Sequence, residues 1–510
     1  MVKMKYFTYK LLLLTTVFTF VISCDNFLAE DPRSLVAPEV FFNSDAEARS
    51  AVNGLYDIYK NNSLWGKVGL DRYYENGSDT IGPNRVFGQV TPIQNYTLGE
   101  GNISDIGQGG GAPLTWQDLY RIISNANLII DKIQDNDNIS PGGRDQFIGE
   151  ALYLRSEAYY HLTNLWGDVP YFTDNLTIEE ISTLGRSDKT LIRNEVISDL
   201  EQAQSLLPDN YSGNNLGRAS KWAAATLATK IHLWLENWQD ARDKAVEIIN
   251  NSTHSLLDNY EDVFDPFNEY NDEIIYSLDF EKDINSQDFT DHFTPRIRDE
   301  PRNDADRDAL QSALDADNFG MTGYGLAIPL PDFVNKFPED DLRRSSNIIE
   351  SLYGLELTFQ YMPKLWNMDQ LNSPRGNHGE NRIIFRFADV YLMAAEAENE
   401  LNGPDGAYQY INEVRKRAYD PEQPLNGLTQ QQFREAIYDE RKWELAGENH
   451  RRMDLIRWGI LLDVVRQTEY RVYNPAQNIQ PRHVLLPIPV EELRLNPALL
   501  DSDPTNNGYR

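Results

Sequence analysis

The chain has 510 residues, of which 41% are hydrophobic and 11% aromatic, so its composition is that of a globular protein with a large core and not that of a disordered chain. Its formal charge of −32 argues against nucleic acid and anionic membrane surfaces as partners, because both repel a strongly acidic protein. The charge is otherwise expected mainly to keep the protein in solution.

The N-terminus has the pattern of a secretory signal peptide. Three lysines precede an apolar run over residues 11–22, which is shorter than a membrane span of roughly 20 residues but has the length of a signal-peptide core. Cys24, the only cysteine, follows this run, so it is a free thiol, an intermolecular partner or a modified residue. Its position directly after Ser23 resembles a bacterial lipobox, in which the cysteine is lipidated. We therefore predict a lipoprotein signal peptide over residues 1–23 and a lipid anchor and tether over 24–40.

Helical periodicity dominates the rest of the chain. Its strongest segment, residues 150–172, has apolar residues at steps of three and four, and Gly167 and Pro170 end it. A Pro-Gly-Gly break at 141–143 separates this helix from its predicted hairpin partner at 116–133. The same period predicts further helices over residues 44–59, 190–207, 218–235, 241–249, 383–401, 407–418, 429–446 and 451–465. Two of these helices begin with capping-box spacing, at Ser44 and Glu47 and at Thr429 and Gln432.

The short connections between these helices predict antiparallel helical hairpins. The expected fold is mostly α, an irregular scaffold with tetratricopeptide-like packing but without that motif's strict repeat of roughly 34 residues. Two long segments, 61–113 and 252–382, lack the helical period and are rich in glycine, asparagine, proline and aromatic residues. We expect them to be insertions of loops and short strands within one domain over 41–510, and to be the place of function.

Several stretches resemble the SusD/RagB family of outer-membrane nutrient-binding lipoproteins. They run in the family's order over nearly the whole chain, and include CDNFLAEDP from Cys24, FFNSDAEARSAVNGLYDIY from Phe41, EALYLRSEAYYHLTNLWGDVPYF from Glu150, GRASKWAAATLATKIHLWLENWQDA from Gly217, FRFADVYLMAAEAEN from Phe385, INEVRKRA from Ile411, DERKWELAGENHRRMDLIRW from Asp439 and HVLLPIP from His483. The agreement is weakest in the two insertions.

This resemblance implies a cell-surface lipoprotein of the outer membrane that is not an enzyme. Such a protein captures an oligosaccharide or polysaccharide and delivers it to a SusC-like TonB-dependent transporter. The alternatives are a helical-repeat lipoprotein that binds only protein partners, a peptide-binding RagB-like protein, and an exported glycosidase.

Sugar binding needs flat aromatic faces together with amide, carboxylate and guanidinium groups. The first insertion offers such a mixture, in Tyr73, Tyr74, Asp79, Asn84, Arg85 and Tyr96. By resemblance, Asp79 stands at the entry to the ligand loop, whereas Tyr73 and Tyr74 could instead pack beneath it. The second insertion offers Tyr270, Arg296, Tyr324 and Trp366, of which Trp366 could equally belong to a buried strand.

Charged residues in the second insertion allow two further interpretations. Arginines at positions 296, 298, 302 and 307 would suit an anionic glycan, but interleaved acidic residues predict a solvated, neutralised loop. Asp304, Asp306 and Asp308 have the alternate spacing of calcium loops, yet Ala309 replaces the required glycine, so an EF-hand is excluded and only a looser calcium site remains open. We expect no other metal and no cofactor.

The densest charged run, residues 441–457, alternates with apolar residues at helical spacing. This pattern predicts ion pairs between packed helices.

Overall fold

The structure is a computed structural model that describes residues 42–510, apart from 68, 87, 89–90, 106–110, 297, 299, 301–302, 318–322 and 367–373. Cys24, the predicted signal peptide and the predicted tether lie outside the described residues. Within the described part, none of the helices combines the length and the apolar character that crossing a bilayer requires.

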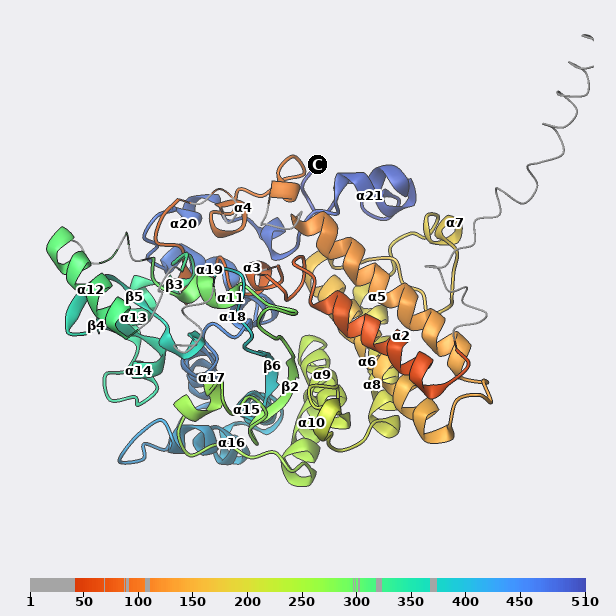
Figure 1. Cartoon of the computed structure of the whole chain (residues 1–510), viewed down its shortest axis with the longest axis horizontal. Coiled ribbons are helices and arrows are strands. Elements are labelled where there is room, and N and C mark those ends of the chain that lie inside the picture. Colours follow the sequence, from red (N-terminus) through yellow and green to blue (C-terminus); the bar gives the residue numbers. More distant parts are fainter. Residues whose placement is uncertain are drawn as a thin grey trace, which may run out of the picture.

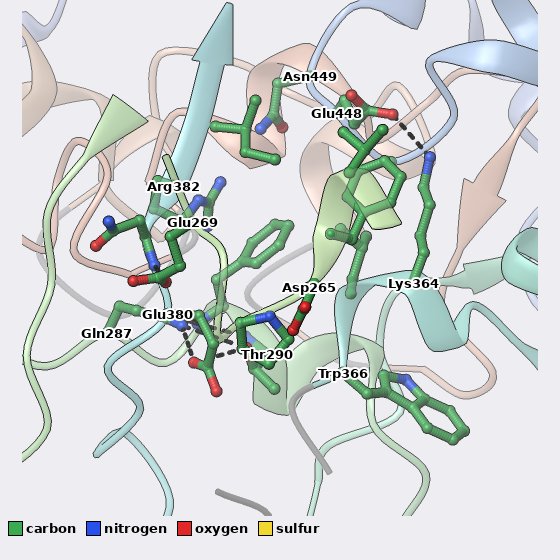
Figure 2. A pocket seen from close by; sticks show the side chains of 18 residues that line it. Asp265, Glu269, Gln287, Thr290, Lys364, Trp366, Glu380, Arg382, Glu448 and Asn449 are labelled. Atoms are coloured by element: carbon green, nitrogen blue, oxygen red, sulfur yellow. Dashed lines mark hydrogen bonds and ion pairs between the residues drawn. The ribbon is translucent and has the colours of Figure 1, made fainter. Parts of the chain in front are cut away.

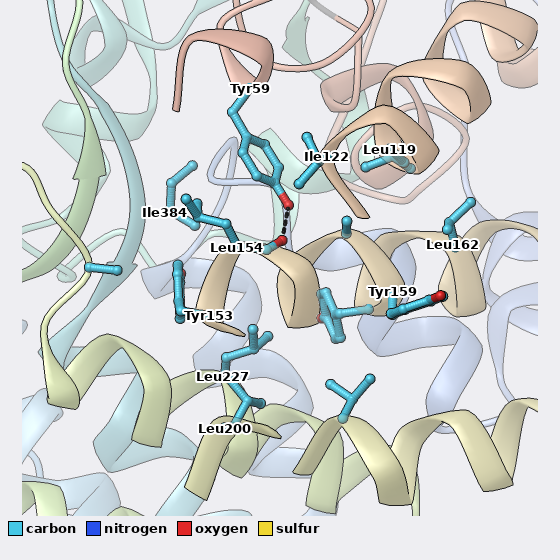
Figure 3. Close-up of a cluster of buried hydrophobic side chains, with 14 of the residues drawn as sticks. Tyr59, Leu119, Ile122, Tyr153, Leu154, Tyr159, Leu162, Leu200, Leu227 and Ile384 are labelled. Atoms are coloured by element: carbon cyan, nitrogen blue, oxygen red, sulfur yellow. Dashed lines mark hydrogen bonds between the residues drawn. The ribbon is translucent and has the colours of Figure 1, made fainter. Parts of the chain in front are cut away.

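Long helices form a bundle at one end of the molecule (Figure 1). They are α2 (Asp45–Tyr59), α5 (Gly111–Ile133), α6 (Pro141–Trp166), α8 (Lys189–Leu206), α9 (Lys221–Trp234) and α10 (Trp238–Asn251). Helix α6 packs against α2, α5 and α8, and its face includes Leu154 and Leu162 (Figure 3). The hydroxyl of Tyr59 donates to the Leu154 carbonyl at 3.0 Å, which ties α2 to α6.

The central helix begins earlier than its sequence pattern predicts. Pro141 is its first residue, and the side chain of Ser140 accepts a hydrogen bond from the Gly143 backbone N–H. Because proline is well suited to the first helical position, the Pro-Gly-Gly segment forms the opening turn, and the predicted break there is wrong. The predicted end is confirmed, since Gly167 has a φ of 74° and follows Trp166.

A second group of helices comes from the C-terminal half. It comprises α15 (Phe387–Asn402), α16 (Pro404–Lys416), α17 (Gln430–Glu444), α18 (Arg451–Arg457) and α19 (Leu461–Gln467). The segment predicted as one helix over 451–465 is divided at Gly459, which has a φ of 72°. The predicted helical start at 383 is also wrong, because β6 (Arg382–Arg386) pairs there with β2 (Ile274–Leu278).

The predicted ion pairs between helices are confirmed. Arg441 of α17 lies 2.7 Å from Asp389 of α15 and 2.8 Å from Asp454 of α18. Arg457 binds Glu396 and, at 2.9 Å, Asp454. The side chains of all these residues are at most 8% exposed, so the cluster joins three helices through charge.

The two insertions contain short elements, as predicted, and meet each other. The first contains α3 (Asp71–Tyr74), β1 (Ile81–Gly82) and α4 (Thr91–Gln94); the second contains β2, α11 (Phe289–Phe293), α12 (Asp304–Ala316), β3 (Ile328–Pro329), α13 (Pro331–Lys336), α14 (Arg344–Asn347), β4 (Ile349–Leu352) and β5 (Leu355–Tyr361). Strands β1 and β3 pair antiparallel, with Ile81 opposite Pro329. This pairing brings segments about 250 residues apart in sequence into contact.

The remaining elements are short. They are α7 (Ile178–Ile181), α20 (Pro475–Asn478), α21 (Val490–Leu495) and the 3-10 helices η2 (Ile103–Asp105), η3 (Gly213–Asn215), η4 (Glu261–Phe264), η6 (Pro363–Leu365), η8 (Pro481–Val484) and η9 (Pro497–Leu500). The mostly helical fold class with few short strands is therefore confirmed.

The aspartates of the suspected calcium loop are part of a helix. Asn303 caps α12, and Asp304 pairs with Arg307 at 2.8 Å. In the described ranges, no group of three or more histidine, cysteine or acidic side chains is arranged to hold a metal ion.

Candidate functional site

Four of the predicted ring residues lie in the core. Tyr73, Tyr74, Tyr96 and Trp366 are each 8% exposed or less. The Tyr74 hydroxyl lies 2.6 Å from Nδ1 of His161, the Tyr96 hydroxyl donates to the Gly77 carbonyl, and the Trp366 indole N–H donates to the Phe293 carbonyl at 2.9 Å. Rings held in this way offer no open face, so burial contradicts the stacking role that the sequence suggested for these four residues.

Asp79 is engaged in an ion pair. Its two oxygens accept from Arg451 at 2.6 and 2.9 Å. Burial opposes ionisation of Asp79, but the Arg451 guanidinium outweighs this effect and holds the pKa of Asp79 below its usual value. The pair lines a groove of about 360 Å³ whose aromatic residues are Phe333, which is 1% exposed, and Tyr438, which stacks on Trp458 at a centroid distance of 3.9 Å.

Tyr270 remains accessible, with 41% of its surface exposed. Burial of the hydroxyl and the nearby Asp279 both raise the pKa of Tyr270.

Four predicted residues from the two insertions meet at one place. The Arg85 guanidinium donates to the Asn84 side-chain oxygen at 2.8 Å and to the Tyr324 carbonyl at 2.7 Å. Gly325, with a φ of 56°, approaches both Asn84 and Arg296 so closely that a Cβ there would lie 3.2 Å from Asn84 Nδ2 and 3.6 Å from the Arg296 backbone nitrogen. Asn84, Arg85, Arg296 and Tyr324 are therefore neighbours.

The ring of Tyr324 contacts two side chains. The His292 ring lies 5.0 Å from it, and the Arg375 guanidinium lies 4.9 Å from its centroid. The backbone is fixed as well, because the Tyr324 N–H donates to the Asp291 carbonyl at 2.6 Å. The ring is partly buried and Arg375 is exposed, so this pair reaches the surface.

Arg72, a buried cation without a partner among the described residues, is one of the charges that act on His292 beside Tyr324. Arg72 of α3 is 3% exposed, and its guanidinium makes no hydrogen bond or ion pair with any described residue. Burial lowers the pKa of Arg72 from its ordinary value, against the attraction of Asp288 and Asp71. Asp288 is equally buried, and burial raises the pKa of Asp288 to about 6 although Lys67 and Arg72 oppose this rise.

We call this group of residues the Tyr324 cluster: Lys67, Arg72, Arg85, Asp288, His292, Tyr324 and Arg375. It combines an aromatic face with guanidinium, carboxyl and imidazole groups, the chemistry by which proteins bind the faces and hydroxyls of sugars.

A partly open pocket lies next to α11 (Figure 2). Phe289 and Thr290 line it, and its polar wall includes Glu380, which accepts from Gln287 at 2.8 Å. Trp366 is also part of its wall. Its volume of about 80 Å³ is far below the roughly 300 Å³ at which ligand pockets begin, so it suits a few water molecules and not an oligosaccharide.

A larger surface groove, of about 490 Å³, runs between α2 and the segment around Gly217. Its aromatic residue, Tyr56, is only 9% exposed. A sugar would find no ring face there.

Comparisons with known proteins agree with this architecture. Residues 338–509 match the family described as "SusD family", and residues 26–233 match "Starch-binding associating with outer membrane". The chain is 53% identical to SusD-like protein P25 of Formosa agariphila, over 96% of this chain and 97% of that protein. The chain belongs to the SusD family.

Solved structures show that SusD proteins share this fold. A laminarin-binding SusD-like protein superposes with a TM-score of 0.73 at 22% identity, covering 89% of this chain and 98% of that one. Surface glycan-binding protein A from Bacteroides thetaiotaomicron, in complex with laminarihexaose, superposes with a TM-score of 0.71 at 20% identity, covering 91% of this chain and all of that one.

Membership confirms several predictions. The SusD family consists of non-catalytic binding proteins associated with the outer membrane, so the prediction that this chain is not an enzyme is confirmed. The family assignment itself is confirmed over both halves of the chain.

Sequence reasoning missed Lys67, Arg72, Asp288, His292 and Arg375. Arg72 directly precedes the two tyrosines that the sequence pointed to, and His292 precedes Phe293 in the second insertion. A signal was available in these charged neighbours of aromatic residues, but only the fold shows that their charges act on one another.

Proposed function

We propose that this SusD protein binds an oligosaccharide or polysaccharide at the Tyr324 cluster and delivers it, unchanged, to a SusC-like TonB-dependent transporter. It is anchored by lipid at Cys24 and faces the cell exterior. The observation that supports this site best is the partly exposed Tyr324 ring, which contacts His292 and Arg375 where both insertions meet.

The chemistry of the cluster supports binding without cleavage. A ring face that covers roughly 40 Å² of sugar contributes about 1 kcal/mol, so it needs help from hydrogen bonds. Arg375 beside the ring, and Arg85 at the Tyr324 backbone carbonyl, supply donors for hydroxyl or acidic groups. The structurally similar proteins named for laminarin and laminarihexaose support a glycan as the ligand.

Affinity electrophoresis against a panel of polysaccharides tests the proposal. We expect at least one polysaccharide to slow migration of the protein, without release of smaller products. The Tyr324→Ala variant should bind about fivefold more weakly, which corresponds to about 1 kcal/mol. Phe267→Ala is the matched control, because Phe267 is 79% exposed and lies outside the cluster.

Three results would contradict the proposal. Binding to no glycan favours a protein or peptide ligand, and product release favours a glycosidase. Equal loss of affinity in Tyr324→Ala and Phe267→Ala would remove the Tyr324 cluster as the site.

A further inference from the structure

Most of the other buried arginines bind carboxylates, and Arg452, which is 3% exposed and binds none, donates instead to the backbone carbonyls of Tyr73 and His483. Arg343 lies 2.7 Å from Asp341 and 2.6 Å from Glu440, and Arg386 lies 2.9 Å from Glu273 and 2.6 Å from Glu444. Arg382, next to Arg72 in space, binds Asp71. Arg72 is buried to the same degree and has no such partner among the described residues.

A buried guanidinium without a counter-ion is costly, because the protein interior replaces the water that would solvate the charge. Proteins retain such an unfavourable buried group at sites where it binds a ligand. Arg72 therefore has the properties of a binding residue and not of a scaffold residue.

Other cations act on the same His292 ring as Arg72. Burial lowers the pKa of His292 well below its usual value, and Arg72, Arg382, Lys67 and Arg85 lower it further. The Arg375 guanidinium stands over the neighbouring Tyr324 ring. This local excess of positive charge occurs in a protein with a formal charge of −32.

The carboxylates that face the cluster are fewer and partly occupied. Asp291 accepts from the Gly376 N–H at 2.7 Å and lies 3.1 Å from His378 Nε2. Asp71 is bound by Arg382. Asp288 interacts electrostatically with both Arg72 and Lys67, yet it forms no ion pair with either.

We propose that the glycan bound at the Tyr324 cluster is anionic, and that Arg72, supported by Lys67 and Arg375, binds its carboxylate or sulfate group. This inference rests on the proposed function. A guanidinium presents paired N–H groups that match a carboxylate or sulfate. The hydroxyls of a neutral sugar would leave the charge of the Arg72 guanidinium uncompensated. Tyr324 then packs against the sugar ring that bears the acidic group.

The first test compares polysaccharides of three kinds in affinity electrophoresis. Laminarin and starch are neutral, polygalacturonate and alginate carry carboxylates, and carrageenan and dextran sulfate carry sulfates. We expect retardation by at least one anionic polysaccharide and by neither neutral one. The acidic surface of the protein repels polyanions in general, so retardation reports a local site.

The outcomes separate the two proposals. Retardation by a neutral polysaccharide, with an affinity that does not change with NaCl, would overturn the anionic inference and leave the proposed function standing. Retardation by none of the six would overturn the proposed function as well. The carboxylate and sulfate arms identify which acidic group is bound.

The second test uses variants in titration calorimetry with an oligosaccharide of the retarding polymer. Arg72→Gln should weaken binding about tenfold or more and flatten its dependence on NaCl, while Arg72→Lys should retain part of the affinity. Arg121→Gln is the control, because Arg121 lies on the exposed face of α5, with its side chain 60% exposed. An Arg72→Gln protein with unchanged affinity and salt dependence would overturn the inference. Should that variant fail to fold, the exposed Arg375→Gln variant tests the same charge excess and is expected to weaken binding in the same direction.

Discussion

The carboxylate of Glu444 in α17 lies 2.6 Å from the guanidinium of Arg386 in β6. The same carboxylate also lies 2.7 Å from Arg343 and from Arg417, so three cations converge on one fully buried acid. Arg386 in turn binds Glu448 at 2.5 Å. This network joins β6, α17 and the segment before α14, and it holds the second insertion against the helical scaffold.

Replacement of Glu444 by glutamine should destabilise the protein by about 3–5 kcal/mol, because it leaves buried guanidinium groups without their shared partner. Urea unfolding followed by circular dichroism measures this change. Glu413→Gln is the control, since Glu413 pairs with Lys416 on the surface and its loss should change the free energy of unfolding by less than about 0.5 kcal/mol. Similar values for the two variants would refute the role of the network.

Glu157 of α6 should make stability depend on pH. It is 1% exposed, and burial raises the pKa of Glu157 to about 8. This pKa lies above that of glutamate in the unfolded chain, so the folded state holds the proton more tightly. The resulting contribution to the free energy of unfolding is complete below about pH 4.5 and is lost as the pH rises to about 8.

The Glu157→Gln variant should therefore gain stability relative to the parent as the pH rises, by at most about 1.4 kcal/mol per pH unit. Urea unfolding of both proteins at intervals between about pH 5 and pH 8 gives this difference. A difference that stays constant over the range would show that the carboxyl group does not titrate there.

Arg72 and Arg382 should respond in opposite ways to loss of charge in the absence of ligand. Arg72→Gln removes an uncompensated buried charge and should raise the free energy of unfolding by about 1 kcal/mol, whereas Arg382→Gln breaks the pair with Asp71 and should lower it by about 3 kcal/mol. Thermal unfolding without glycan compares them. If both variants lose stability equally, Arg72 has a partner that the structure does not reveal.

Trp366 belongs to the second hydrophobic core, with Phe293, Tyr361 and Trp443. Its replacement by alanine should cost about 3–5 kcal/mol, because a large buried side chain is removed. Trp366→Phe should fold and should bind glycan within about twofold of the parent, which corresponds to less than about 0.5 kcal/mol. Titration calorimetry on Trp366→Phe measures this affinity. A large loss of affinity in a folded variant would show that the Trp366 ring takes part in glycan binding.

Cys24→Ala should move the protein from the membrane to the soluble fraction after cell fractionation, since acyl chains stabilise membrane binding by about 0.8 kcal/mol per buried methylene. A metabolic label of fatty acid should mark the parent and not the variant. If the Cys24→Ala variant remains in the membrane fraction, the lipid anchor at Cys24 is contradicted.

The sequence by itself determined the features that depend on neighbouring residues. Backbone geometry explains the apolar steps of three and four in α6 and the end of this helix at Gly167. It also explains the alternation of charged and apolar residues that predicted the ion pairs of Arg441 and Arg457. The family followed from ordered stretches of the same kind. The run Ile383-Ile384-Phe385 was misassigned because a short apolar segment fits a strand as well as a helix.

Only the tertiary structure decided which side chains are accessible. Tyr73 and Tyr324 both stand in loop-rich insertions, yet Tyr73 is 1% exposed whereas Tyr324 is partly open, because different distant segments cover them. The proximity of Arg72 and of Tyr324 to the same His292 ring depends on contacts between two insertions separated by about 250 residues, including the pairing of β1 with β3. Exposure and the lack of a counter-ion are properties of such contacts, and no local pattern in the chain contains them.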